Sequence, residues 1–172
     1  MKKLMLAAAA AACLVASPAA AQGMGLYATG GLTHADTDFD VSFEAVTGRL
    51  GARFAKHVAV EGELTVGFEQ DKVDGVTVEL TNDYGIYGVG LLPMTDNADL
   101  IARVGFGRTN IEAGDEDLSH EGVRYGVGAQ FFFNGMSGVR IDFTRYDLGD
   151  EMTGEEQDAD AYTVSYVHKF GG

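Results

Sequence analysis

The sequence predicts an all-β chain in which eight antiparallel strands close into an up-and-down transmembrane β-barrel after an N-terminal signal peptide. Three observations support this fold class. Residues 1–21 have the composition of an export signal, which leaves residues 22–172 as a single domain. Within that domain there are eight strand-like segments, and all but the fourth alternate clearly between apolar and polar side chains with a period of two. Short and long connections then alternate between the segments, as in a transmembrane barrel.

The signal peptide is predicted from its three consecutive parts. Lys2 and Lys3 are followed by an apolar run at 4–16 and by an A-x-A cleavage site at 19–21. The run is shorter than the ~20 apolar residues of a membrane-spanning helix, so cleavage is favoured over a retained anchor. Removal of this segment also removes Cys13, the single cysteine. The exported domain is therefore expected to fold without disulfides.

Eight segments are predicted as strands, and the last of them has the roughly nine residues that a tilted strand needs to cross a bilayer. They are residues 26–33, 47–54, 58–68, 76–92, 100–108, 123–133, 139–146 and 162–170.

The first half of the domain contains the first four segments. In the first three, the even-numbered positions are apolar or glycine, and the odd-numbered positions carry most of the polar side chains. An acidic loop at 36–40 separates the first two segments, and a short link at 55–57 joins the second to the third. A second acidic loop at 69–74 leads to the fourth segment, whose alternation is too weak to give a register. A turn at 93–97 follows it.

The second half contains the remaining four segments. The fifth alternates apolar residues with Arg103 and glycines, and an acidic loop at 112–121 separates it from the sixth. The sixth ends at Asn134-Gly135, a strong hairpin signal. A long acidic loop at 147–160 separates the seventh segment from the eighth.

The connections predict which ends of the strands lie together. Short ones follow the second, fourth and sixth segments, and long acidic ones follow the first, third, fifth and seventh, so all long loops are expected at one end. Such asymmetry is typical of transmembrane barrels. All but five of the 26 acidic residues lie in or beside those loops, the exceptions being Glu61, Glu63, Asp96, Asp99 and Asp142.

In a membrane barrel the apolar faces contact lipid and the polar faces fill the lumen. An eight-stranded barrel is narrow enough for side chains to fill it, so we expect a plugged, hydrogen-bonded lumen with charges of both signs. The residues expected in this ion-pair network are Arg49, Arg53, Glu61, Glu63, Arg103, Gln130, Arg140 and Asp142, and Arg124 lies on the same polar faces.

Several segments carry a family resemblance. The third segment contains Glu61, Asp99-Leu100-Ile101-Ala102-Arg103 begins the fifth, and Val139-Arg140-Ile141-Asp142-Phe143 begins the seventh. The last segment ends in Phe170 with aromatics at alternate positions. In these features the chain resembles the eight-stranded outer-membrane barrels related to the OmpA transmembrane domain, often described as porin-family proteins. It departs from them in having Gly171 and Gly172 after the final aromatic residue.

The resemblance implies a monomeric barrel in the outer membrane of a Gram-negative bacterium, with a structural or surface-interaction role. It implies an ion pair between Glu61 and Arg140, and it implies partners among outer-membrane lipids, lipopolysaccharide and the barrel assembly machinery. The residues of the last strand that would form the assembly signal are Tyr162, Val164, Tyr166 and Phe170.

The outward faces suggest contacts with the membrane. By parity, Arg108 and Arg145 emerge on the lipid face at the loop end of their strands, where an arginine can reach headgroups. We expect both to contact lipopolysaccharide phosphates. The aromatic residues expected in the interface girdles are Tyr125, Phe133, Tyr162 and Phe170.

Two alternatives come from other functional classes. A secreted, lipocalin-like soluble barrel would bind a small apolar ligand with its apolar face inward. An outer-membrane lipid-modifying enzyme would use His34 or His120 with a serine, although the adjacent Ser119 and His120 would point apart. We expect no catalytic residues and no cofactor.

Charge and spacing bear on two further kinds of ligand. Asp36-x-Asp38-x-Asp40 and Asp115-Glu116-Asp117 lack the rest of an EF-hand loop, so we expect no defined metal site. The net charge of −14 argues against nucleic acid as a partner.

Overall fold

The computed structural model describes residues 25–37, 42–68, 70–73, 76–113, 116–149 and 156–170. The predicted signal peptide, the centres of the acidic connections and the two final glycines lie outside these ranges. Within them the chain forms strands β1 (Gly25–Thr37), β2 (Ser42–Ala55), β3 (Val58–Gly67), β4 (Gln70–Val73), β5 (Val76–Thr95), β6 (Ala98–Ala113), β7 (Glu116–Phe132), β8 (Ser137–Gly149) and β9 (Glu156–Phe170). No helix in these ranges is long and apolar enough to cross a membrane.

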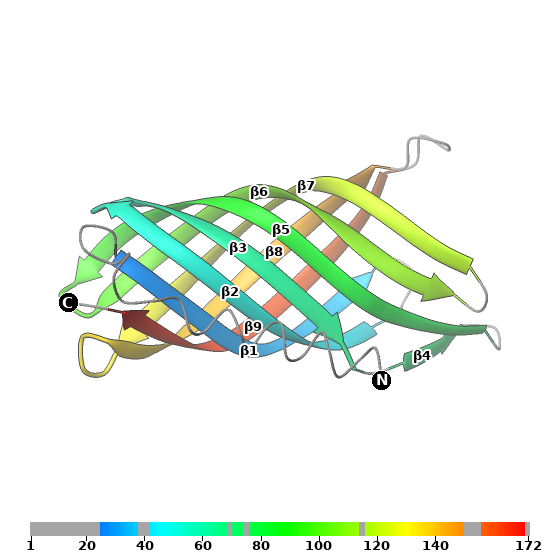
Figure 1. The fold of residues 1–172 in the computed structure, drawn as a ribbon, viewed down its shortest axis with the longest axis horizontal. Helices are drawn as coiled ribbons and strands as arrows, with labels where there is room; N and C mark the ends of the chain where they lie inside the picture. Colours follow the sequence, from blue (N-terminus) through cyan, green and yellow to red (C-terminus); the bar gives the residue numbers. More distant parts are fainter. Residues whose placement is uncertain are drawn as a thin grey trace.

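Eight of these strands close into an antiparallel barrel, as predicted (Figure 1). Each pairs with its neighbour in sequence, and β3 pairs with β5. The barrel closes where β1 pairs with β9 over twelve residue pairs from Leu26↔Phe170 to Thr37↔Ala159. The short strand β4 pairs only with β5 among the described strands, as a hairpin that extends one end of the barrel. The chain is thus an eight-stranded up-and-down barrel.

The two ends of the barrel differ. The short turns after β2, β5 and β7 lie at one end, here called the turn end, and the other connections lie at the opposite end, called the loop end (Figure 1).

The predicted extent of the acidic loops is wrong, because strand pairing continues through much of them. β6 and β7 pair as far as Ala113↔Glu116, and β8 and β9 pair as far as Gly149↔Glu156. Alternation of apolar and polar residues follows the burial of one strand face, whereas backbone hydrogen bonds can continue into water. The sequence pattern therefore ends before the strands do.

Side-chain orientation follows the odd and even positions of each strand. Ile86 and Val127 on the outer wall are 62% and 60% exposed, whereas Arg49 and Arg140 inside the barrel are 3% and 0% exposed. A soluble barrel would have the reverse arrangement, because its apolar residues would form the core. The geometry therefore excludes the lipocalin-like alternative.

The register of the fourth barrel strand, which the sequence did not reveal, is fixed by pairing with both neighbours. β5 pairs Leu64↔Tyr84 with β3 and Tyr84↔Arg108 with β6. Asp83 and Tyr87 consequently point into the barrel, and so do the apolar Val89 and Leu91 nearer the turn end. This inward apolar pair explains why the alternation was hard to read.

Glycines on the inner wall make room for large side chains. A Cβ on Gly51 would lie 2.1 Å from the Tyr27 ring, and one on Gly107 would lie 2.5 Å from the Arg124 guanidinium carbon. Any larger residue at either position would displace a buried side chain. These two glycines therefore allow the lumen to be packed with long polar residues.

Candidate functional site: the charged lumen

The middle of the lumen contains a buried ion-pair chain that starts on β3 and β8. Arg140 on β8 donates from Nη1 to Glu61 Oε1 and from Nη2 to Glu61 Oε2 at 3.2 Å. Its Nε donates to Asp142 Oδ1 at 2.9 Å. The Tyr27 hydroxyl on β1 donates to Glu61 at 2.6 Å. These hydrogen bonds join side chains of β1, β3 and β8 across the barrel.

Glu63 is the second centre of the network. Its carboxylate accepts hydrogen bonds from Arg49 Nε at 2.5 Å, from Arg103 Nη2 at 2.6 Å and from the Tyr87 hydroxyl at 2.8 Å. Arg49 also donates to Asp142 Oδ2 at 2.9 Å, which joins this centre to the Arg140 group. The network therefore joins side chains of β1, β2, β3, β5, β6 and β8 without interruption.

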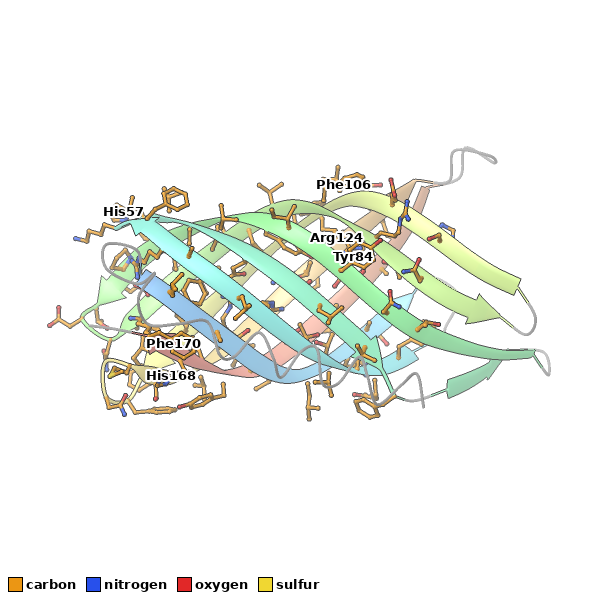
Figure 2. All side chains as sticks on the ribbon, in the orientation of Figure 1. His57, Tyr84, Phe106, Arg124, His168 and Phe170 are labelled. Carbon is orange, nitrogen blue, oxygen red and sulfur yellow. The ribbon has the colours of Figure 1, made fainter. Side chains whose placement is uncertain are left out.

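A third group lies nearer the loop end. Arg124, labelled in Figure 2, donates to Asp83 Oδ1 at 2.8 Å and to Thr109 Oγ1 at 3.1 Å. Thr109 in turn donates to Asp83 at 2.7 Å. The guanidinium carbon of Arg124 lies 4.7 Å from the centre of the Tyr146 ring. This arrangement holds a fully buried arginine against one carboxylate and one aromatic face.

The charges balance within the central network and the Arg124 group. Four arginines face four carboxylates, and each is at most 5% exposed. They are Arg49, Arg103, Arg124 and Arg140, with Glu61, Glu63, Asp83 and Asp142. Such balance suits a low-dielectric interior, where an unpaired charge would be costly.

Uncharged hydroxyls complete the polar lining on β1, β2, β3 and β9. Thr33 lies 2.6 Å from Thr47 and 2.8 Å from Thr163, and Thr47 lies 2.8 Å from Thr65, measured between hydroxyl oxygens. This threonine row links four neighbouring strands.

Two of the predicted network residues belong to a separate layer at the turn end. Gln130 donates to Asp99 Oδ2 at 2.8 Å, and Arg53 Nη1 lies 3.7 Å from the same oxygen. Arg53 also donates to the Lys56 carbonyl. An apolar cluster adjoins both this layer and the central network, and it consists of Tyr27, Ala59, Tyr87, Val89, Leu91, Ile101, Phe132 and Val167. The structure thus brings six of the eight predicted lumen residues together and places Arg53 and Gln130 apart.

A few buried nitrogens in the described lumen have no protein partner. They are Nε and Nη1 of Arg103 and Nε of Arg124. Arg103 instead stacks on Tyr87, with its guanidinium carbon 3.6 Å from the ring centre. In the described part of the chain, no three His, Cys, Asp or Glu side chains are grouped so as to hold a metal ion.

Sequence reasoning missed four members of the lumen: Tyr27, Asp83, Tyr87 and Tyr146. Tyr27 lies on the face of the first segment that was correctly predicted to be polar. Its odd-numbered position was the signal that could have placed it in the lumen. Asp83 and Tyr87 lie on the strand whose register could not be read. Tyr146 lies beside Arg145, but pairing it with Arg124 required the β7–β8 register.

On the outer wall, Arg108 and Arg145 each contact a carboxylate on the neighbouring strand. Arg108 Nε donates to Glu121 at 2.7 Å, and Arg145 donates to both oxygens of Asp160 at 2.7 and 2.6 Å. The side chains of the two arginines are 45% and 40% exposed.

The aromatic residues expected in the girdles lie on the same outer wall, as do the assembly-signal residues. Tyr125 and Phe133 are 49% and 60% exposed, and Tyr162, Val164 and Tyr166 are 51%, 58% and 51% exposed. Phe170 is half-buried, and its ring centre lies 5.1 Å from that of His168 at the turn end (Figure 2).

Two of the residues weighed for catalysis, His34 and Ser119, have other partners. His34 Nδ1 lies 2.7 Å from Glu44 Oε1, and Ser119 donates to Asn110 Oδ1 at 2.6 Å. A serine–histidine contact occurs at the opposite end, where Ser137 Oγ lies 3.1 Å from His168 Nδ1 and accepts from the Tyr166 hydroxyl at 2.8 Å.

A closed barrel with an apolar outer wall and a charged interior is the architecture of outer-membrane proteins. The family model of the outer membrane protein β-barrel domain matches residues 5–170. The chain belongs to this family. It is therefore an outer-membrane protein of a Gram-negative bacterium. No curated relative matches the chain.

Solved structures with the same fold share little sequence with this outer-membrane barrel. OprG from Pseudomonas aeruginosa is 13% identical with a TM-score of 0.61, covering 87% of this chain and 97% of OprG. Ail, the attachment invasion locus protein of Yersinia pestis, is 12% identical with a TM-score of 0.59, covering 86% of this chain and 99% of Ail. Neisserial surface protein A is 14% identical with a TM-score of 0.59, covering 86% and 97%.

Proposed function

We propose that this outer-membrane barrel is a structural or surface-interaction protein whose lumen is plugged against ions by its charged side chains. The observation that carries the proposal is the continuous buried network from Tyr27 to Asp83. It crosses the lumen through residues of β1, β2, β3, β5, β6, β7 and β8, and Arg124 on β7 joins Tyr87 to Asp83. A permeating ion would have to separate buried pairs, and breaking one such pair typically costs about 3–5 kcal/mol.

Planar bilayer recording tests the plug. The refolded wild-type barrel is expected to give no stepwise conductance. A variant with both Glu63→Ala and Arg103→Ala removes a matched pair of charges at the network centre and should show small conductance steps. The double change Arg108→Ala and Glu121→Ala, which removes the exposed pair on the outer wall, is the matched control and should remain silent. Regular steps in the wild type would contradict the plugged lumen.

The loop end is proposed to face the cell exterior and to be acidic. Strand residues there include like charges directly opposite one another, as in Asp36↔Asp160 and Asp147↔Asp158. Like charges in such positions destabilise a sheet, and cations offset part of the repulsion here, since Arg145 donates to Asp160 and His34 lies 3.2 Å from Asp36. The concentration of acidic residues at this end supports a surface role. Protease digestion of intact cells should cut at the loop end but not within the turn at 134–136.

Arg108 and Arg145 are proposed to contact lipopolysaccharide phosphates at this end. Their position on the outer wall, their exposure and their long alkyl stems support the proposal. Each carboxylate partner leaves some guanidinium N–H groups for a phosphate, because an arginine carries five donors. The double variant Arg108→Met and Arg145→Met should lose lipopolysaccharide on purification, and Arg53→Met at the opposite end should retain it. Equal retention by both variants would refute this assignment.

The outward face of β9 is proposed to be the signal read by the barrel assembly machinery. Tyr162, Val164 and Tyr166 form an exposed stripe that leads to Phe170 at the turn end. In cells, Phe170→Ala should accumulate unassembled chain, while Phe131→Ala, which removes an exposed aromatic residue from β7, should assemble. We also infer a monomer, because the barrel is closed by β1 and β9 of the same chain.

A lipid-modifying enzyme receives less support. Neither His34 nor Ser119 contacts the other members of a nucleophile–base chain, and each has a different hydrogen-bond partner. Lipid A that is unchanged in mass when the protein is overproduced would agree with a non-enzymatic role.

A further inference from the structure

The turn end of the lumen contains a cavity that the charged plug does not use. It measures about 100 Å³, and four residues of the apolar cluster, Tyr27, Leu91, Phe132 and Val167, line it together with Arg53 and Gln130 of the turn-end layer. Its walls combine the apolar side chains of Leu91, Phe132 and Val167 with two cations, Arg53 and Lys169. A cavity of this kind can hold a short molecule with one charged end and one apolar end.

Lys169 is the unusual member of this cavity. Its Nζ lies 3.4 Å from the centre of the Phe132 ring, and among the described residues it forms no ion pair with a carboxylate. It points inward near the C-terminal end of β9, where it pairs with Tyr27 on β1. A half-buried ammonium beside an aromatic face retains N–H groups that can donate hydrogen bonds to an anion.

The charged groups near Lys169 do not neutralise its ammonium. Asp99 is the acidic residue near the cavity, and its carboxylate already accepts from Gln130 and lies 3.7 Å from Arg53. Arg53 is 22% exposed and uses its Nε on the Lys56 carbonyl. The cavity therefore has a local excess of positive charge, although the whole chain has a net charge of −14.

We propose that this cavity binds a short aliphatic carboxylate from the turn-end side of the membrane. The carboxylate contacts Lys169 Nζ and the Arg53 guanidinium, and the alkyl portion packs against Leu91, Phe132 and Val167. The volume admits a chain of a few carbon atoms, since an apolar cavity of about 150 Å³ accommodates benzene. Two sources share this chemistry: a free short-chain acid and the C-terminal residue of a peptide.

The test is a titration of the isotope-labelled, refolded full-length mature barrel in detergent micelles, followed by backbone amide NMR. Butyrate represents the free acid, and N-acetylalanine represents a peptide end. Amide signals of Phe132, Val167 and Lys169 should shift saturably with one of the two probes. They should not shift with equal concentrations of sodium chloride or butylammonium. The probe that saturates at lower concentration identifies the source.

Variants separate this site from general attraction to a cation. Lys169→Met keeps the alkyl stem and should weaken binding about tenfold or more, because a charge-assisted hydrogen bond is lost. Lys169→Arg should restore binding and shows that the strand still folds. Lys56→Met, which removes an exposed cation outside the cavity, should bind like the wild type. Saturation by neither carboxylate, or equal binding by Lys169→Met and the wild type, would overturn the proposal.

This result is independent of the plugged lumen. A barrel that conducts ions could still bind carboxylates at the turn end, and a silent barrel could fail to bind them. The conductance experiment therefore tests the plugged lumen alone, and the NMR experiment tests the carboxylate site alone.

Discussion

Replacing Arg140 with methionine should be among the most destabilising single changes in this barrel. Arg140 is fully buried and holds two carboxylates, Glu61 and Asp142. Without it, Glu61 keeps only the hydrogen bond from Tyr27, and Asp142 keeps only Arg49. Removing one partner of a buried ion pair typically costs about 3–5 kcal/mol. Because both carboxylates retain one partner, we expect the lower end, about 3 kcal/mol.

The assay is urea unfolding of the barrel in lipid vesicles, followed by tyrosine fluorescence and by mobility on unboiled gels. With a denaturant slope of about 1–3 kcal/mol per molar urea, the loss corresponds to a midpoint lowered by about 1–3 M. Arg108→Met is the control, because it breaks an exposed ion pair on the outer wall and should leave the midpoint nearly unchanged.

A second variant identifies the cause of the loss. Adding Glu61→Gln to Arg140→Met removes the uncompensated charge, while the amide oxygen can still accept from Tyr27. The double variant should therefore recover about 1–3 kcal/mol relative to Arg140→Met alone. If the double variant is no more stable than the single one, the loss comes from packing, and the reasoning from buried charge is wrong.

Three further changes test other parts of the structure. Gly51→Ala should destabilise the barrel by about 1–3 kcal/mol because its Cβ would lie 2.1 Å from the Tyr27 ring, whereas the outward-facing Gly30→Ala, with no atom within 4 Å, should be tolerated in the same urea assay. Thr47→Val removes the hydroxyl that joins two members of the threonine row and should cost about 1 kcal/mol, with an unchanged fold by circular dichroism. Phe170→Ala should slow refolding into vesicles less than it slows assembly in cells; equal slowing in both would argue against a role in recognition by the assembly machinery.

The orientation of the side chains could be predicted because it depends on local sequence. Arg49 and Glu61 occupy odd-numbered positions in segments whose even-numbered positions are apolar, so their shared face followed from parity alone. The same pattern failed in β5, where the inward Val89 and Leu91 are apolar and the outward positions include glycines. It also ended too early at the loop end, where strand pairing continues through acidic residues.

The partners within the lumen could not be predicted in the same way. Arg53 and Gln130 share the inward face with Arg49 and Arg140, yet they belong to a different layer near the turn end. Asp83 and Arg124 meet although 41 positions separate them in the chain. Their depth along the barrel axis depends on the stagger of every strand relative to its neighbours, which a single segment does not reveal.

The sequence by itself determined that all barrel strands except β5 alternate apolar and polar faces, that successive strands run in opposite directions, and that the acidic residues gather at one end. These properties follow from the two-residue period of a strand and from the order of short and long connections, both of which are local. Only the tertiary structure decided which arginine meets which carboxylate, where the apolar cluster lies relative to the ion-pair network, and that Lys169 lies over Phe132. Those contacts join residues from different strands, and closure of the barrel sets the stagger that brings them to the same depth.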